Sequence, residues 1–150
     1  MIYEKDDVDF SALLAAAARA RKRAYAPYSG YQVGAALLAE DGRVFTGCNV
    51  ESAAYSPTNC AERTAVFKAV SEGCLRFKAL AVAGGHRDKE LGELDYFTPC
   101  GVCRQVLREF CSEDFPVAIA GPGEDYKVLS LGELLPFGFG PETVPDARKD

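Results

Sequence analysis

The sequence predicts an α/β sandwich built on a mixed sheet. Two segments of strand character are joined by an Asp-Gly pair, which is a strong signal for a β-hairpin. Beyond the hairpin, segments with apolar residues at helical spacing alternate with short apolar runs typical of buried strands. The chain has 150 residues, enough for a single domain over 1–150 with a well-buried core. A hairpin followed by alternating helices and strands favours a sheet with helices packed against it.

The first predicted helix runs from about Phe10 to Tyr25, a segment rich in Ala and Leu. Asp9 or Ser11 can cap its start, and Pro27 ends the run. The basic run Arg19-Ala20-Arg21-Lys22-Arg23 lies near its end. We interpret this run as a solvated face, because cations at a helix C-terminus interact favourably with the helix dipole.

Two antiparallel strands are expected next, over Gln32–Ala39 and Arg43–Val50, with Asp41-Gly42 in the turn between them. From Thr58 the apolar spacing becomes helical, which predicts a second helix. Gly73 is its expected C-cap, because glycine readily adopts the left-handed conformation at that position.

The alternation continues in the C-terminal half. The apolar run Phe77–Gly84 is typical of a buried strand, and 84–94 is expected to be an exposed connection. His86 lies in that connection and is interpreted as a surface residue. A helix is expected to begin at Pro99-Cys100, since proline suits the first positions of a helix. The remaining expected elements are strands over 117–120 and 126–129 and a helical turn over 131–135.

Composition argues against several classes of function. Hydrophobic residues make up 48% and charged residues 26% of the chain, and no apolar stretch is long enough to span a bilayer. The first residues, Met1 to Asp7, lack the basic and apolar regions of a secretory signal, which favours a cytoplasmic location. Six cysteines are too few for a disulfide scaffold. The net charge of −5 disfavours a polynucleotide partner, so we expect a small-molecule substrate.

Two cysteine motifs carry the chemistry. Cys60-Ala61-Glu62 is followed 40 residues later by Cys100-Gly101-Val102-Cys103. Both motifs fall at predicted helix N-termini, where the helix dipole lowers the pKa of thiols. Three thiolates leave one position of a tetrahedral zinc site open for water, which is the pattern of hydrolytic zinc sites. We therefore predict that Cys60, Cys100 and Cys103 bind one Zn²⁺ per chain.

Three charged residues are candidates to support that zinc. Glu62 lies two residues beyond the first cysteine and is the candidate proton shuttle, acting as general acid and base. Three thiolates and Zn²⁺ sum to a charge of −1, which some nearby cation has to offset. Arg63 and Arg104 are the candidates to donate hydrogen bonds to the ligand sulfurs.

Two alternatives compete for the cysteines. Cys-x-x-Cys at a helix start is also a thioredoxin-type redox motif, but here it lacks the usual flanking Trp and leaves Cys60-Ala61-Glu62 unexplained. A purely structural zinc site would need a fourth ligand from Cys48, Cys74 or Cys111. Each of these is better interpreted as a small buried apolar residue.

With these residues assembled, the chain resembles the short, homotetrameric cytidine deaminases of the cytidine and deoxycytidylate deaminase superfamily. The resemblance covers most of the chain. The motifs that carry it are Tyr25-Ala26-Pro27-Tyr28-Ser29, Val33-Gly34-Ala35-Ala36-Leu37, Gly47-Cys48-Asn49-Val50-Glu51, Ala53-Ala54-Tyr55-Ser56, Asn59-Cys60-Ala61-Glu62-Arg63-Thr64-Ala65 and Pro99-Cys100-Gly101-Val102-Cys103-Arg104-Gln105. The resemblance implies a three-layer sandwich with a mainly five-stranded mixed sheet.

The implied reaction is the hydrolysis of cytidine and 2′-deoxycytidine to uridine and 2′-deoxyuridine with release of ammonia, a step of pyrimidine salvage. By resemblance, zinc-activated hydroxide attacks C4 of the cytosine ring while Glu62 protonates N3. The rival functions are deamination of a cytosine-containing nucleoside antibiotic and a non-catalytic, zinc-stabilised binding module. A polynucleotide editor ranks last, since the chain is acidic and has no signal for a basic groove.

The substrate-binding residues implied by the resemblance are Tyr31, Asn49, Glu51, Tyr55, Ala61 and Phe139. Tyr31 occupies the position at which the family usually has a Phe against the base. Asn49 and Glu51 would bind the ribose hydroxyls; from the residues alone, capping a turn is the less favoured alternative. The backbone of Ala61 would hold the edge of the base. Phe139 would reach into the site of a neighbouring subunit, which makes the expected homotetramer one with shared active sites.

Overall fold

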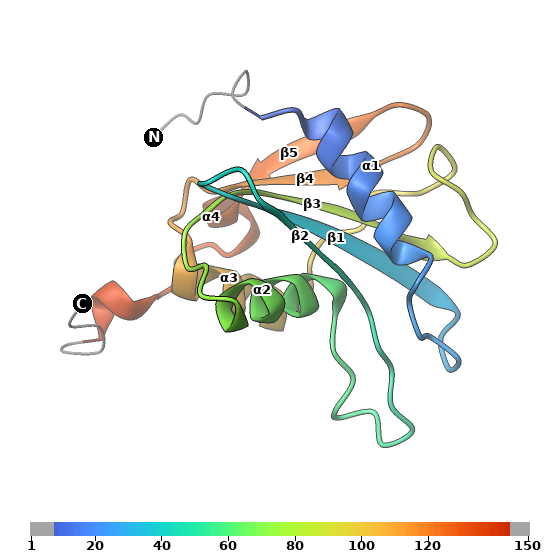
Figure 1. Cartoon of the computed structure of the whole chain (residues 1–150), viewed down its shortest axis with the longest axis horizontal. Coiled ribbons are helices and arrows are strands. Elements are labelled where there is room, and N and C mark those ends of the chain that lie inside the picture. The colour runs from blue at the N-terminus through green and yellow to red at the C-terminus, as the bar shows by residue number, and fades with distance from the viewer. Residues whose placement is uncertain (1–7, 145–150) are drawn as a thin grey trace.

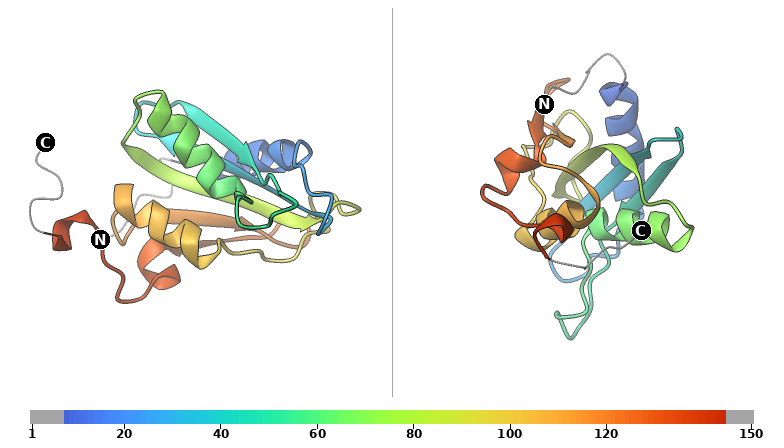
Figure 2. Two further views of the ribbon diagram at one scale, coloured as in Figure 1. Left: turned by 90° about the horizontal axis from the view of Figure 1, so that it is seen from below. Right: turned by 90° about the vertical axis from the view of Figure 1, so that its left-hand side faces the viewer.

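Five strands form one mixed sheet in the order β2-β1-β3-β4-β5 (Figure 1). The computed structural model describes residues 8–144. In chain order the elements are α1 (Phe10–Arg21), β1 (Tyr31–Ala39), β2 (Val44–Cys48), α2 (Ala61–Ser71), β3 (Phe77–His86), α3 (Gly101–Phe110), β4 (Pro116–Ala120), β5 (Tyr126–Ser130), α4 (Leu131–Leu134) and a short 3₁₀ helix (Pro141–Thr143). α1 covers one face of the sheet, and α2 and α3 lie side by side on the other (Figures 1 and 2). The predicted three-layer sandwich is confirmed.

The sheet combines antiparallel and parallel pairs. β1 is antiparallel to both β2 and β3, and the predicted hairpin turns at Gly42, whose φ is +94°. β3 and β4 are parallel, with α3 in the connection between them, and β5 returns antiparallel to β4. β2 ends at Cys48, two residues before the expected end of the strand. After Cys48 the chain no longer pairs with β1 as a strand, because Val50 forms bridges with Tyr25 and Asn59 instead.

Side chains alternate along the strands and so build two separate cores. Toward α2 and α3, the sheet presents large residues such as Leu37, Leu80 and Ile119. Toward α1, it presents mainly alanines, among them Ala36, Ala81 and Ala118. The small side chains on that face allow the Ala-rich helix α1 to pack close to the sheet.

Two glycines on neighbouring strands bring the helices into direct contact with the sheet. A Cβ at Gly34 would lie 1.9 Å from the carbonyl oxygen of Ala17 in α1. On the opposite face, a Cβ at Gly47 would lie 2.4 Å from the carbonyl oxygen of Ala61 in α2. Both contacts are far shorter than van der Waals distances, so only glycine fits at either position. Gly47 thereby sets the height of the first turn of α2 above the sheet.

The end of α1 differs from the prediction. The helix ends at Arg21, four residues early, because the backbone of Tyr25 bonds to Asn49 and Glu51 instead of continuing the helix. Asp9 caps the start, as one of the two predicted candidates. The interpretation of the basic run as a solvated face is wrong for Arg21, which is 0% exposed, because backbone carbonyl oxygens surround its guanidinium.

The connection after β3 also departs from the prediction. His86 is the last residue of β3 and is not part of the connection. Leu94 lies in the expected exposed segment but is fully buried in the core beneath α1. Smaller shifts affect α2, which begins at Ala61 and not at Thr58, and is capped by Glu72, with Gly73 following at φ +88°.

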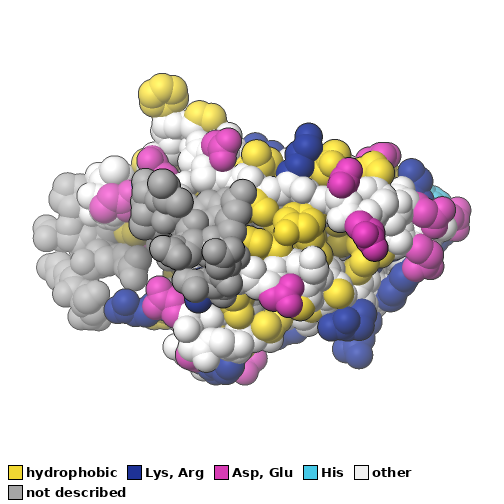
Figure 3. Space-filling view, turned by 90° about the horizontal axis from the view of Figure 1, so that it is seen from above, with side chains coloured by type: hydrophobic (Ala, Val, Ile, Leu, Met, Phe, Trp, Pro, Cys, Tyr) yellow, Lys and Arg dark blue, Asp and Glu magenta, His cyan; other side chains and the backbone are white. Residues whose placement is uncertain are grey.

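The described surface is mixed in charge. On the face seen in Figure 3, Asp and Glu side chains are interspersed with Lys, Arg and apolar side chains. Among residues 8–144, no helix has the length and apolar character needed to cross a bilayer.

Candidate metal centre

The first turns of α2 and α3 bring three cysteine sulfurs together. Cys60 and Cys100 are the N-cap residues of the two helices, and Cys103 lies in the first turn of α3. The Sγ atom of Cys100 is 3.6 Å from that of Cys60 and 3.5 Å from that of Cys103. All three ligand atoms lie within 4.8 Å of one another. Tetrahedral zinc with Zn–S bonds of about 2.3 Å places its sulfur ligands about 3.8 Å apart, so these thiols fit one zinc ion.

The thiols share protons in a way that suits replacement by a metal. The pKa of Cys60 falls to about 5, because its sulfur accepts hydrogen bonds from the Cys103 thiol and from Arg63. The pKa of Cys103 is raised, because its thiol donates to Cys60 and is buried. Zinc requires all three as thiolates, and its charge takes the place of the proton that the buried pair retains.

Glu62 is buried beside the sulfurs with an unsatisfied oxygen. Its side chain is 2% exposed, and its Oε1 atom has no hydrogen-bond partner among the described residues. Burial raises the pKa of Glu62 to about 7, and the negative charge of Cys60 contributes to the rise. A buried carboxyl oxygen without a hydrogen-bond partner costs free energy, and carboxyl groups with pKa values perturbed by burial cluster at functional sites. With a pKa near neutrality, this group can both accept and donate a proton.

The two arginines predicted to contact sulfur have different environments. Arg63 donates from Nη2 to the Sγ atom of Cys60 at 3.3 Å. Within residues 8–144, Arg104 donates no hydrogen bond to a sulfur. Its guanidinium donates to the carbonyl oxygens of Pro99 and Leu134, each at 2.6 Å, and to Thr98 Oγ1. Through these bonds Arg104 braces the segment before Cys100 against α4.

Asn49 and Glu51 have their polar groups bonded to the backbone near the start of β1. Asn49 Oδ1 accepts from the Val33 N–H, and its Nδ2 donates to the Tyr31 carbonyl, each at 2.9 Å. Glu51 accepts hydrogen bonds from the two N–H groups and the hydroxyl of the segment Tyr28-Ser29. Both residues therefore perform the turn-stabilising role that the sequence left open. The lowered pKa of Glu51, caused mainly by the Ser29 hydroxyl, keeps it a carboxylate with further lone pairs to offer.

The aromatic candidates lie at the surface. Tyr31 is 47% exposed, and its ring lies beside the rings of His86 and Phe97, with centroid distances of 6.4 and 6.3 Å. Tyr55 is more exposed and has a positive φ of 61°, in a segment that projects from the sheet between β2 and α2 (Figures 1 and 2). Phe139 is 59% exposed, and its carbonyl oxygen accepts from Gln105 in α3.

Sequence reasoning named Ala61 as a site residue but did not name Phe97. Ala61, fully buried, is the first residue of α2, between the Cys60 sulfur and Glu62. Phe97 was missed, because it lies in a polar connection and has no periodic pattern around it. Its position could have identified it, because Phe97 lies two residues before the Pro99-Cys100 pair of the second cysteine motif.

Comparison with known proteins gives a consistent result. Residues 8–119 match the family model described as the cytidine and deoxycytidylate deaminase zinc-binding region. A cytidine deaminase of Sporosarcina psychrophila is 50% identical over 142 residues, covering 95% of this chain and 99% of the relative. The crystal structure of cytidine deaminase from Burkholderia pseudomallei superposes with a TM-score of 0.76 at 46% identity, covering 85% of this chain and 97% of that one. For cytidine deaminase from Mycobacterium tuberculosis the TM-score is 0.75 at 40% identity, with 89% and 99% covered.

Proposed function

This chain belongs to the cytidine and deoxycytidylate deaminase family, and we propose that it converts cytidine and 2′-deoxycytidine, with water, into uridine and 2′-deoxyuridine and ammonia. The observation that carries this proposal is the buried carboxyl group of Glu62, whose Oε1 has no hydrogen-bond partner among the described residues, beside three thiols with the spacing of zinc ligands. A redox pair of cysteines or a closed structural zinc site needs no such carboxyl group.

Cys60, Cys100 and Cys103 would hold one zinc ion per chain. When bound, zinc supplies Lewis acidity that lowers the pKa of a water molecule to near neutrality. Arg63 offsets part of the negative charge of the three thiolates by donating to the Cys60 sulfur. Cys60 and Cys100 are the N-cap residues of α2 and α3, so the positive ends of the two helix dipoles stabilise the same charge.

Glu62 moves the protons of the reaction. Its carboxylate takes a proton from the attacking water and delivers it to N3 of the cytosine ring as the oxygen bonds to C4. It then takes the remaining proton from the new C4 hydroxyl and transfers it to the amino group, which leaves C4 as ammonia while the C4 carbonyl of uridine forms. The pKa of about 7 places this carboxyl group in the range in which one residue can perform both transfers.

The start of β1 provides the wall for the base. Tyr31 shares the side-chain direction of Val33 and Ala35, whose core also contains residues of α2 and α3. Its half-exposed ring therefore faces the layer that carries the cysteines, and we propose that it lies against the pyrimidine. The backbone of Ala61 would meet the edge of the base, and Asn49 and Glu51 would bind the ribose hydroxyls.

Exposed aromatic residues support a shared active site. Phe137 is fully exposed and Phe139 largely so, although burial of such rings is favourable by about 2 kcal/mol each. We propose that they, together with Tyr55, meet neighbouring subunits in a homotetramer, with Phe139 entering a neighbour's site. We further propose one catalytic domain over residues 1–150 and a role in pyrimidine salvage in the cytoplasm. A polynucleotide substrate is disfavoured by the mixed charges of the face in Figure 3.

The direct test is to incubate the purified protein with cytidine and follow ammonia release together with the ultraviolet change of the ring. We expect turnover that a zinc chelator abolishes and added zinc restores. A protein that binds zinc but leaves cytidine unchanged would instead be a zinc-stabilised binding module.

A further inference from the structure

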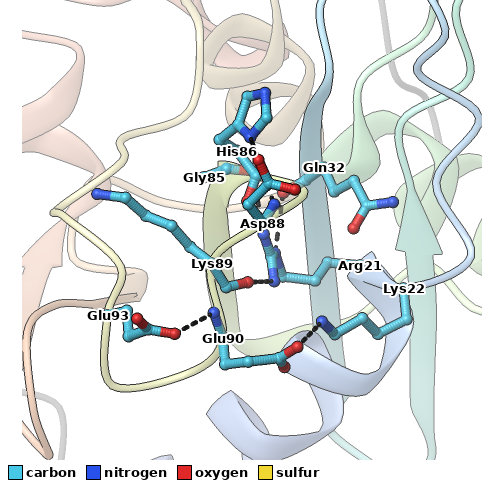
Figure 4. Close-up of polar contacts among 9 residues, drawn as sticks. All are labelled: Arg21, Lys22, Gln32, Gly85, His86, Asp88, Lys89, Glu90 and Glu93. Atoms are coloured by element: carbon cyan, nitrogen blue, oxygen red, sulfur yellow. Dashed lines mark hydrogen bonds and ion pairs between the residues drawn. The ribbon is translucent and has the colours of Figure 1, made fainter.

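A buried arginine connects α1 to the sheet at some distance in sequence from the cysteine motifs. Arg21, the last residue of α1, is 0% exposed. Its guanidinium donates to four backbone carbonyl oxygens: Nε to Gln32 at 3.1 Å, Nη1 to Lys89 at 2.7 Å, and Nη2 to Gly85 and His86 at 3.0 and 2.9 Å. Figure 4 shows the side chain enclosed by these groups.

The four carbonyl groups belong to the ends of two strands and to the turn that follows. Tyr31 pairs with His86, and Gln32 with Gly85, as the last pairs between β1 and β3. The chain then turns over residues 86–89, where Lys89 N–H donates to the His86 carbonyl. Arg87 N–H donates to the carbonyl of Gly30, just before β1. Arg21 therefore fixes the end of the β1–β3 ladder and this turn as one unit.

Stability alone is a poor explanation for this arrangement. Burial lowers the pKa of Arg21, while the charge of Glu90 raises it. Glu90 lies outside the guanidinium contacts and is paired with Lys22 at 2.7 Å. Taking a charged group out of water carries a desolvation penalty, which the four hydrogen bonds have to offset. The planar fork of arginine instead provides fixed geometry at several acceptors at once.

The unit held by Arg21 carries Tyr31 and His86, whose rings form an aromatic wall together with that of Phe97. Tyr31 directly precedes Gln32, and its ring meets the His86 ring edge to face at 86°. The Tyr31 ring also lies beside that of Phe97, with the ring centroids 6.3 Å apart, and Phe97 leads through Thr98 and Pro99 to Cys100. A Cβ at Gly84 would lie 2.9 Å from the Phe97 ring, so this ring also rests directly on β3.

We propose that Arg21 is a positioning residue for substrate binding. By fixing the ends of β1 and β3, it holds the Tyr31, His86 and Phe97 rings in the position in which the pyrimidine ring of the substrate can lie against Tyr31. This inference rests on the proposed function. Arg21 itself touches no substrate, and it acts through the backbone at the ends of β1 and β3.

The test compares Arg21→Met and Arg21→Lys with Arg19→Met and Arg23→Met, two exposed arginines near the end of the same helix. For Arg21→Met we expect the KM for cytidine to rise about tenfold while kcat changes less than about threefold. The reason is that displaced aromatic rings weaken substrate binding equally in the ground state and in the transition state. Arg21→Lys should recover part of the KM, since an ammonium group can reach some of the carbonyls. The zinc content should stay at the wild-type value, and both controls should match the wild type.

Hydrogen exchange gives a second readout. The Arg87 and Lys89 amides should exchange faster in Arg21→Lys than in the controls. A wild-type KM in both Arg21 variants would overturn the inference, even if the melting temperature falls, and so would a loss of kcat alone. If Arg21→Met does not fold, the KM of Arg21→Lys decides. A wild-type protein without turnover would overturn the proposed function and this inference together, which distinguishes the two failures.

Discussion

The surroundings of Glu62 are unusual for a carboxyl group. A carboxyl group is normally solvated or paired, yet this one is enclosed at the first turn of α2 with Oε1 unsatisfied within residues 8–144. The unfavourable burial of this carboxyl group persists because the packing of Ala61 and Ala65 fixes α2 against the sheet. The first turn of α2 thus holds an acid that can exchange protons next to a group of thiols. This arrangement is the basis of the proposed chemistry.

Replacing Glu62 by glutamine should separate metal binding from catalysis. Glu62→Gln keeps the shape of the side chain but cannot accept or donate the transferred protons. Turnover of cytidine should fall at least about 10²–10⁴-fold, the usual contribution of a general acid and base. Zinc per chain, measured by elemental analysis, should be unchanged. Glu72→Gln, at the exposed end of the same helix, is the control and should keep full activity. Substantial activity in Glu62→Gln would remove this residue from the mechanism.

At the scale of elements, close helix–sheet contacts place the site. The α2 helix lies on Gly47 so closely that its Ala61 carbonyl and Ala65 N–H groups occupy the space of a Cβ. The Cys60 sulfur and the Glu62 carboxyl are both mounted on that first turn. The position of β2 in the sheet therefore fixes the position of the reactive groups relative to α3.

A methyl group at Gly47 should disturb both stability and metal binding. Gly47→Ala forces α2 away from β2, and overpacking of this kind costs about 1–3 kcal/mol of unfolding free energy. We expect a lower midpoint in urea and weaker retention of zinc during dialysis against a chelator. Gly101→Ala, where a Cβ would meet nothing within 4 Å, should be at least as stable as the wild type. Equal stability of Gly47→Ala and Gly101→Ala would show that the contact is not restrictive.

The elements themselves were largely predictable from sequence, whereas their long-range contacts were not. The Asp41-Gly42 turn and the apolar spacing in α2 and α3 are local signals, so the hairpin and both helix starts were found within a few residues. Arg21 lies in a basic run, and only tertiary contacts with Gly85, His86 and Lys89 turn it inward. The hydrogen bond from Arg104 to the Leu134 carbonyl and the burial of Leu94 likewise depend on segments distant in sequence.

At the scale of the whole molecule, the metal site joins two halves of the chain. Cys60 follows the hairpin half, while Cys100 and Cys103 open the helix between the parallel strands β3 and β4. One zinc ion therefore closes a loop of about 40 residues, so its binding should also stabilise the fold. The same molecule leaves Phe139 exposed on the segment after α4. That segment is held to α3 through Gln105 and through the ion pair of Arg108 with Glu142.

Activity should depend on assembly. If Phe139 completes a neighbour's site, an isolated subunit should be nearly inactive, and Phe139→Ala should lose activity while retaining its zinc. We would measure turnover and sedimentation over the same dilution series. Leu75→Ala, an exposed apolar residue in the turn after α2, should behave as the wild type. Full turnover by a species shown to be a monomer would refute the shared site.

The central claim is that Cys60, Cys100 and Cys103 together hold the catalytic zinc. The most direct measurement is the zinc content and cytidine turnover of Cys103→Ala, compared with Cys111→Ala. Both cysteines are buried at α3 and both have a raised pKa, but Cys103 belongs to the cluster of three sulfurs and Cys111 lies outside it. We predict that Cys111→Ala keeps one zinc per chain and its activity, and that Cys103→Ala loses both. Full zinc content with normal turnover in Cys103→Ala would contradict the account.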